Sequence, residues 1–254
     1  MNNRAIGLIF HERVGLGERR ISPFSWRIRY ALAHTEIEPQ VVPTRFADVD
    51  RIRRLSGQDL VPIIEDEGRV VHDSWAIACH LEDRFPDRPS LFGGAIGRGA
   101  ARLVNVWADT VLGRQMRRQI YADFIRCIDP GDRAYFRSSR ESQLGVTLED
   151  YSARRDQALP EFLETCAPLE RTLSEQAFLA GDAPAYVDYV VFSVFQWARV
   201  GSPRDVLPET AKMSATRDWR ARMVSLYDEL GDRFPGYPTA HSSPDEGASG
   251  ANGA

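Results

Sequence analysis

Three short segments of this 254-residue chain carry residue types that could hold a small peptide-like anion and activate its thiol. The first, Ser22-Pro23-Phe24-Ser25-Trp26-Arg27, places a hydroxyl just before an expected helix. The second, Val61-Pro62, places a proline at the mouth of a short apolar strand. The third, Asp73-Ser74, opens another helix with an acid and a hydroxyl. No single segment is diagnostic, so the prediction depends on their order and spacing.

Ser22 has two interpretations that use the same geometry. As a helix N-cap, its side chain accepts a hydrogen bond from a free backbone N–H, and Pro23 suits the first helical position. As a site residue, it lies at a helix N-terminus, which attracts anions, and donates its O–H to a thiolate. Such a bond to a charged group contributes roughly 1.5–3 kcal/mol. That energy lowers a thiol pKa of about 8.5 by roughly one to two units, so a bound thiol ionises substantially at neutral pH.

The other two segments also allow a structural and a functional interpretation. Val61-Pro62 is either a plain strand entry or an open edge whose backbone pairs with an extended peptide ligand. Asp73 and Ser74 are either a simple helix cap or the groups that hold an α-amino group and an α-carboxylate. The residues alone leave both pairs of alternatives open.

The elements that position these segments follow from hydrophobic periodicity. An apolar run predicts a strand over residues 5–10, and helical spacing predicts a helix over 24–34. A short strand at 41–42 and a helix at 47–55 come next. Residues 60–64 and 69–72 form a predicted hairpin, and a helix starts at Asp73 or Ser74 and ends near Phe85. The order β-α-β-α-β-β-α predicts a small mixed sheet covered by helices, an α/β domain.

The second half of the chain has helical periodicity only. A Pro- and Gly-rich linker precedes it, and helices are expected over 100–126, 148–176, 187–199 and 215–230, with breaks at Pro160 and Pro168. The fold class is therefore an α/β domain at residues 1–87, a linker at 88–99 and an all-helical bundle at 100–238. From about Thr239 the composition predicts a disordered tail at 239–254.

Composition and charge exclude several classes of function. The net charge of −4 and pI of about 5.8 argue against nucleic-acid binding, which needs a concentrated basic face. We find no signal-peptide pattern and no apolar run near the roughly 18–20 residues that span a bilayer, so we expect a cytoplasmic protein without membrane contact. Three cysteines without a CxxC pair argue against a disulfide framework. The spacing of His11, His34, His72 and His80 relative to these cysteines does not predict a metal site.

The three segments together resemble the thioredoxin-like domain of glutathione S-transferases. In that family a Ser, Tyr or Cys after the first strand contacts the sulfur, and the residue before a cis-proline binds the cysteinyl unit. A Glu/Asp-Ser pair binds the γ-glutamyl end. The resemblance assigns these roles to Ser22, to Val61-Pro62 and to Asp73-Ser74, with glutathione as co-substrate. Because Ser22 stands where thioredoxin and omega-type enzymes carry a reactive Cys, it favours thiolate stabilisation over thiol–disulfide exchange.

The resemblance extends through the second half. The stretch from Phe178-Leu179-Ala180-Gly181-Asp182 to Asp188 is similar to the helix-start motif of the family's C-terminal domain, although Ala185 replaces the usual capping residue. Within the family, Ile21 to Arg27, His72-Asp73-Ser74-Trp75 and Arg217-Asp218-Trp219 look most like the bacterial glutathione-dependent β-aryl etherases of lignin breakdown and their fungal relatives. The resemblance implies a transferase, and a homodimer.

In this hypothesis the thiolate attacks an electrophilic carbon of an aromatic or apolar co-substrate, and in the etherase version it cleaves a β-aryl ether. Trp107, Met116 and Tyr121 are candidates for the co-substrate pocket, with bundle core as the alternative. Gln58 could reach the glycine carboxylate or serve in a turn, and Ser25 is a second candidate for the sulfur contact. The rival hypotheses are a non-catalytic glutathione-binding or interaction module and a glutathione-dependent reductase or isomerase.

Overall fold

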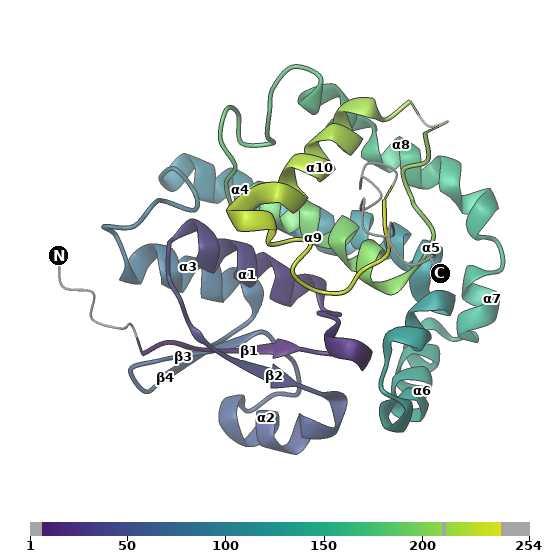
Figure 1. Ribbon diagram of the computed structural model, residues 1–254, viewed down its shortest axis with the longest axis horizontal. Coiled ribbons are helices and arrows are strands. Elements are labelled where there is room, and N and C mark those ends of the chain that lie inside the picture. The colour runs from purple at the N-terminus through teal and green to yellow at the C-terminus, as the bar shows by residue number, and fades with distance from the viewer. Residues whose placement is uncertain (1–6, 210–211, 240–254) are drawn as a thin grey trace, which may run out of the picture.

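The N-terminal half is a four-stranded mixed sheet with helices on both faces. The computed structural model describes residues 7–209 and 212–239. The strands are β1 (Ile9–Arg13), β2 (Gln40–Thr44), β3 (Ile63–Asp66) and β4 (Arg69–His72), in the order β2-β1-β3-β4. β1 is parallel to β2 and antiparallel to β3, and β3 is antiparallel to β4. The predicted α/β fold class is confirmed, and Figure 1 shows it at lower left.

Three helices cover this sheet. α1 (Pro23–His34) and α3 (Ser74–Arg84) lie on the face toward the second half of the chain, and α2 (Val49–Ser56) lies on the opposite face (Figure 1). The sheet therefore has two apolar layers. Leu8, Phe10 and Ile64 join the main core, whereas Ile52, Val61 and Ile63 form a smaller cluster beneath α2. In this arrangement the C-terminal end of β1 and the start of α1 lie together at one edge of the sheet.

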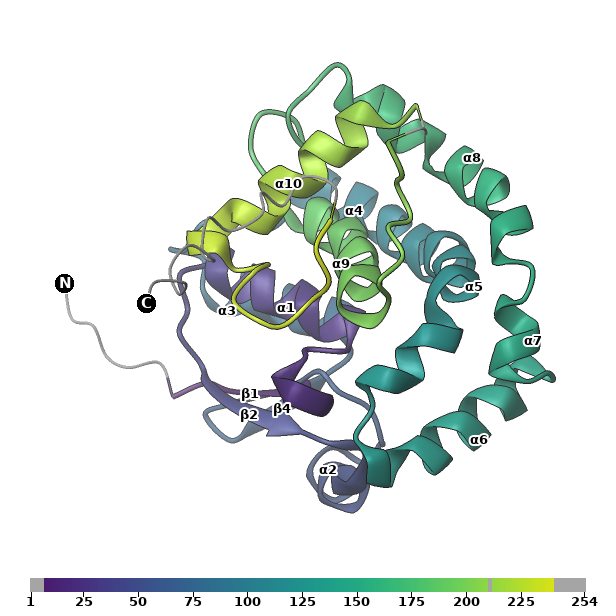
Figure 2. The ribbon, with the colours of Figure 1, turned by 45° about the vertical axis from the view of Figure 1, so that its right-hand side comes forward.

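The C-terminal half consists of helices, as predicted. They are α4 (Ala95–Trp107), α5 (Gly113–Phe124), α6 (Arg133–Leu144), α7 (Leu148–Ser152), α8 (Arg155–Leu173), α9 (Tyr186–Gly201) and α10 (Ser214–Glu229). Nearly all of α9 is buried, and it contacts α1, α4, α5 and α10. Figure 2 shows α5, α6, α7 and α8 as an arc to the right of this central helix. No helix within the described ranges is both long and apolar enough to cross a membrane.

Several predicted elements differ from the structure. β1 ends at Arg13, three residues beyond the predicted strand over 5–10, and α6 lies where no helix was predicted. α8 is continuous although Pro160 and Pro168 lie inside it, because both prolines are on its exposed face, where water can reach the carbonyls they leave unpaired. α4 begins at Ala95, inside the predicted linker. Gly97 contributed to the linker prediction, but its role is steric: a Cβ there would lie 1.9 Å from the Phe92 carbonyl oxygen. The predicted tail, apart from Thr239, lies outside the described residues.

A buried arginine connects the two halves. Arg27 of α1 forms an ion pair with Asp109 at 2.7 Å and donates to Asn105 Oδ1 and Ser193 Oγ at 3.3 and 3.2 Å. Its guanidinium also lies 4.8 Å from the Phe24 ring centroid. Because these partners come from α4, α9 and the π-turn at Ala108–Leu112, Arg27 fixes the start of α1 against the helical half.

Candidate active site

Ser22 lies at the first turn of α1 and acts as its N-cap. Its Oγ accepts a hydrogen bond from the Ser25 N–H at 3.2 Å, and Pro23 occupies the first helical position. A hydroxyl has one proton to donate and two lone pairs. No acceptor for the Ser22 proton exists among the described residues, although the side chain is largely buried and lines a cavity. The cap therefore leaves this donor available to a ligand.

Ser25 is not equivalent to Ser22. Its side chain is fully buried and accepts a hydrogen bond from the Arg13 N–H at 3.4 Å, so it joins α1 to the end of β1. It is also not among the residues that line the cavity. Of the two candidate hydroxyls, the structure brings only Ser22 to the cavity.

Val61 and Pro62 lie directly before β3. Val61 lines the same cavity as Ser22, and the Val61–Pro62 peptide bond is cis. Neither the N–H nor the carbonyl of Val61 has a backbone partner in the described part of the chain. Unpaired backbone groups beside a sheet can pair with an extended peptide. This geometry suits the predicted role of Val61 as a backbone contact for a cysteinyl unit.

Asp73 and Ser74 open α3. Oδ1 of Asp73 accepts hydrogen bonds from the N–H groups of Trp75 and Ala76, both at 3.0 Å. Asp73 has φ of +72° and ψ of 127°, a strained conformation of the kind that clusters at functional sites. Because Ile63 pairs with His72, continuing that register places Pro62 across from Asp73. The acid–hydroxyl pair is thus adjacent to Val61-Pro62, although neither residue lines the cavity itself.

Gln58 forms a local turn. Its amide nitrogen donates to Ser56 Oγ and to the Leu60 carbonyl, at 2.9 and 2.8 Å, and its oxygen accepts from the Leu60 N–H at 2.6 Å. Gln58 does not line the cavity. The turn interpretation therefore accounts for its side-chain contacts, and a contact to a ligand would have to replace at least one of them.

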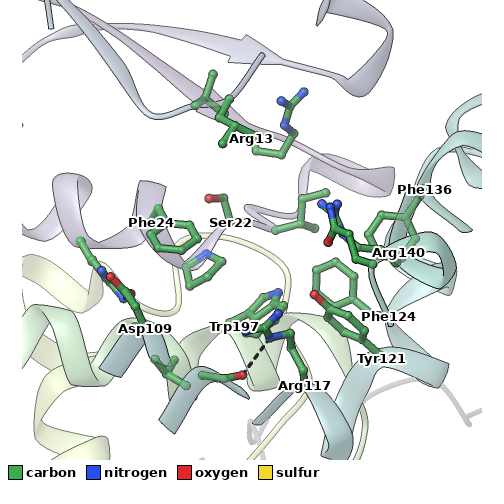
Figure 3. A pocket seen from close by; sticks show the side chains of 18 of the residues that line it. Arg13, Ser22, Phe24, Asp109, Arg117, Tyr121, Phe124, Phe136, Arg140 and Trp197 are labelled. Atoms are coloured by element: carbon green, nitrogen blue, oxygen red, sulfur yellow. Dashed lines mark hydrogen bonds and ion pairs between the residues drawn. The ribbon is translucent and has the colours of Figure 1, made fainter. Parts of the chain in front are cut away.

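The cavity lies between the two halves and has a volume of about 340 Å³. The sheet side contributes Ser22, Val61, Arg13 and Phe46, and the helical side contributes mainly aromatic and basic residues (Figure 3). The lining residues of the helical side include Asp109, Gly113, Arg117, Tyr121, Phe124, Phe136, Arg140 and Trp197. A ligand held at Ser22 would thus face an aromatic wall.

One stripe of α5 and the preceding π-turn lines the cavity. Asp109, Gly113, Arg117, Tyr121 and Phe124 recur at spacings of three or four, which places them on a single helical face. Of the three predicted pocket residues, Tyr121 lies on this stripe.

The other two predicted pocket residues are not among the lining residues. Met116 is fully buried one position away from the stripe, and Trp107 packs against the helical core. For these two residues the structure favours the bundle-core alternative. Because Arg117 and Gly113 are not apolar, the sequence interpretation missed them, although the four-residue spacing from Tyr121 would have identified the stripe.

Aromatic rings connect the basic groups across the cavity. The Arg13 guanidinium lies 4.5 Å from the centroid of Phe46, and that of Arg140 lies 5.3 Å from the centroid of Phe136. Phe46 and Phe136 are themselves in contact, with ring centroids 5.9 Å apart. Tyr121 extends the wall, with its ring 6.3 Å from Phe136 and 5.6 Å from Trp197.

Burial affects the ionisation of groups on both sides. Loss of solvent lowers the pKa of Arg13 to about 10, with the nearby charge of Arg140 acting in the same direction and Asp48 and Asp132 opposing it. Burial raises the pKa of Tyr121, while the charges of Arg140 and Arg117 oppose the increase. The charge of Arg140 thus acts on both Arg13 and Tyr121, and the charge of Arg117 acts on Tyr121, so guanidinium groups from both sides of the cavity lie near one another.

Protein thiols and metal ligands are not gathered at this site. Cys79, Cys127 and Cys166 are free and do not line the cavity, and burial raises the pKa of Cys166 to about 12. Within residues 7–209 and 212–239, no three His, Cys, Asp or Glu side chains are grouped to hold a metal ion. The polar side chains that line the cavity include the Ser22 hydroxyl, the Tyr121 phenol and the arginines, together with Asp109 and Gln143.

Comparisons with known proteins identify the family of the chain. Residues 21–84 match the family model "Glutathione S-transferase, N-terminal domain", and residues 101–228 match "Glutathione S-transferase, C-terminal domain". The chain is similar to a glutathione S-transferase of Ceriporiopsis subvermispora solved in complex with glutathione. The two are 19% identical with a TM-score of 0.74, over 94% of this chain and 99% of that one.

Two further solved structures are similar. A glutathione transferase of Phanerochaete chrysosporium is 25% identical with a TM-score of 0.68, over 89% of this chain and 98% of that one. A glutathione S-transferase of Rhodospirillum rubrum is 19% identical with a TM-score of 0.66, over 92% and 97% of the two chains. The chain thus covers nearly the full length of each of these proteins.

Proposed function

Because the chain belongs to the glutathione S-transferase family, we propose that it is a transferase in which Ser22 stabilises the thiolate of bound glutathione. The observation that carries the proposal is the Ser22 hydroxyl, which caps α1 through its lone pair and retains a proton to donate into the cavity. The free N–H groups at the start of α1 add a favourable field for an anion.

Glutathione would bind in extended form along the edge of the sheet. The unpaired backbone groups of Val61 would pair with its cysteinyl unit, and Asp73 and Ser74 would hold its γ-glutamyl end. The sulfur would then point to Ser22 and to the aromatic wall beyond it. This assignment follows from the order of the three segments along the edge of the sheet.

In the reaction, the glutathione thiol releases its proton to solvent and the sulfur forms a C–S bond with an electrophilic carbon. The leaving group departs with the electron pair of the bond that breaks. We propose an aromatic co-substrate, because Phe46, Phe136, Tyr121 and Trp197 give the cavity flat apolar surfaces. Cleavage of a β-aryl ether is the most specific form of this proposal, with an aryloxide as the leaving group.

The test is turnover with glutathione, with product identification by mass spectrometry. We expect a thioether product from an activated aryl halide, and from a β-aryl ether if the specific form is correct. Glutathione binding without any thioether product would favour a non-catalytic module. Formation of glutathione disulfide would favour a reductase. The homodimer implied by the resemblance is a separate prediction, which light scattering would test.

A further inference from the structure

The charge of the cavity lining is opposite to that of the whole chain. Its lining includes the arginines Arg13, Arg27, Arg117 and Arg140 and a single acid, Asp109, which gives a formal charge of +3. The chain as a whole has a net charge of −4. Arg27 is already paired with Asp109, so the excess charge resides on the other three arginines.

None of these three arginines has a carboxylate partner within the part of the chain that the structure describes. Arg117 donates to the Gly113 carbonyl at 3.3 Å, and Arg140 donates to Ser139 Oγ at 3.2 Å. Arg13 donates to the Arg45 carbonyl and is only 7% exposed, and the charges of Asp48 and Asp132 act on it without forming an ion pair. Buried guanidinium groups are normally paired with anions, because a charge loses its hydration when it is buried. Arg13 is buried and Arg117 and Arg140 are half-buried, and their neutral hydrogen-bond partners compensate for only part of that loss.

The positions of these groups indicate where an anion would bind. Arg13 approaches from the end of β1, whereas Arg117 and Arg140 approach from α5 and α6 (Figure 3). All three side chains border the aromatic wall of Phe46, Phe136 and Tyr121. The cavity therefore combines flat apolar surfaces with donors suited to a carboxylate.

The carboxylates of glutathione do not account for this charge in the proposed binding mode. Its γ-glutamyl carboxylate would lie at Asp73 and Ser74 and its glycine carboxylate near Gln58, and none of these three residues lines the cavity. The thiolate would use the Ser22 hydroxyl. Arg117 and Arg140 lie on the helical side of the cavity, in the space proposed for the second substrate, and Arg13 borders that space from the sheet side.

We propose that the co-substrate is an aromatic electrophile bearing a carboxylate, and that Arg13, Arg117 and Arg140 form the subsite for this group. The proposal rests on the transferase function proposed above and specifies its substrate class. The guanidinium groups bind the carboxylate, and the aromatic wall packs against the ring. A neutral aromatic electrophile uses the wall alone and binds more weakly.

A matched pair of probes tests the proposal with the full chain and glutathione. The carboxylate probe is 4-chloro-3,5-dinitrobenzoate, and the carboxamide probe is the corresponding neutral amide. In both, the glutathione sulfur forms a C–S bond at the carbon that bears chlorine, and chloride leaves with the electron pair. Each kcat/KM is divided by the uncatalysed rate constant, so that the different intrinsic reactivities of the probes cancel.

We expect the wild type to favour the carboxylate probe and the Arg117→Gln/Arg140→Gln variant to lose that preference. A hydrogen bond to a charged group supports a loss of about ten- to a hundredfold in kcat/KM for the carboxylate probe. The carboxamide probe should change little. The control variant is Arg114→Gln/Arg137→Gln, which removes the same charge from the same two helices but outside the cavity lining. It should retain the preference.

Isothermal titration with 3,5-dinitrobenzoate and its amide measures binding without turnover, because neither has a leaving group. Tighter binding of the carboxylate to the wild type, lost in the double variant, supports the subsite even if no turnover occurs. Equal binding of both compounds to the wild type would overturn it. An equal decrease in kcat/KM for both chloro probes in the double variant would also overturn the subsite. Weaker glutathione binding in the double variant would overturn it as well. Failure of both chloro compounds to react, with glutathione bound, would instead refute the transferase proposal.

Discussion

Replacing Ser22 with alanine should raise the pKa of the bound glutathione thiol. Ser22 Oγ has its acceptor side engaged by the Ser25 N–H at 3.2 Å and its proton available to the cavity. The substitution removes that donor and leaves the helix N-terminus, the cavity and the arginines in place. The difference between wild type and variant therefore isolates the contribution of one hydroxyl.

The size of the effect follows from the type of bond. A hydrogen bond to a charged group contributes about 1.5–3 kcal/mol, which corresponds to roughly 1.1–2.2 pKa units. From a reference near 8.5, the bound thiol would titrate at about 6.3–7.4. At pH 7 the thiolate fraction rises from about 3% to between about 30% and 80%. The field of the α1 N-terminus alone contributes about 0.3–1 kcal/mol, so it cannot replace the hydroxyl.

The assay is a pH titration of thiolate absorbance with saturating glutathione, recorded for the wild type and for Ser22→Ala. Loss of the N-cap also costs about 1 kcal/mol of stability, so thermal unfolding is measured in parallel. Ser22→Thr is the conservative control, because threonine retains both the cap and the donor. Ser25→Ala is the matched control, because it removes a nearby hydroxyl that does not line the cavity.

The expected result is a higher thiol pKa in Ser22→Ala and values near that of the wild type in both controls. A donor that stabilises the thiolate lowers the pKa of the glutathione thiol, so removal of that donor raises this pKa. Identical titration of bound glutathione in the wild type and in folded Ser22→Ala would refute the mechanism. A shift of the same size in Ser25→Ala would show that the effect arises from the helix start as a whole.

Three further predictions follow from other contacts. In the native protein Cys166 should resist alkylation at neutral pH because burial raises its pKa to about 12, whereas the partly exposed Cys79 should react first, as peptide mapping would reveal. Asp73→Gly should relieve about 1–3 kcal/mol of backbone strain, so Tm should hold or rise while calorimetry records weaker glutathione binding. Gly201→Ala should cost about 1–3 kcal/mol in denaturant unfolding, because its Cβ would lie 2.1 Å from the Phe124 ring; unchanged stability would contradict the packing described.

The elements that could be predicted from the sequence are those with local signals. Ser22-Pro23 predicted the start of α1, and Asp73-Ser74 predicted the start of α3, because capping depends on residues within one turn. The absence of a capping side chain at Ala185 did not move the start of α9. Asp188 accepts N–H groups from Leu179, Ala180 and Ala185, so the acid alone secures this turn.

The cavity could be predicted only in part, because its residues come together through tertiary packing. Phe46 and Phe136 are in contact although they are 90 positions apart in the sequence, and no local sequence pattern predicts this contact. The arginines were missed for a different reason. A charged residue on a helix usually faces solvent, so Arg117 and Arg140 carried no signal until the aromatic residues around them were located.

In the proposed mechanism, the Ser22 hydroxyl and the three arginines would together address one electrostatic problem. A thiolate and a carboxylate in the same cavity repel each other, by about 4 kcal/mol at 4 Å with an effective dielectric constant of 20. Without compensation, the co-substrate would raise the thiol pKa on binding and reverse the effect of Ser22. The guanidinium groups of Arg13, Arg117 and Arg140 offset this repulsion, since each attracts both anions. If the proposal is correct, the hydrogen bond from Ser22 to the sulfur and the positive charge of the arginines would together keep the thiolate ionised while an anionic electrophile binds.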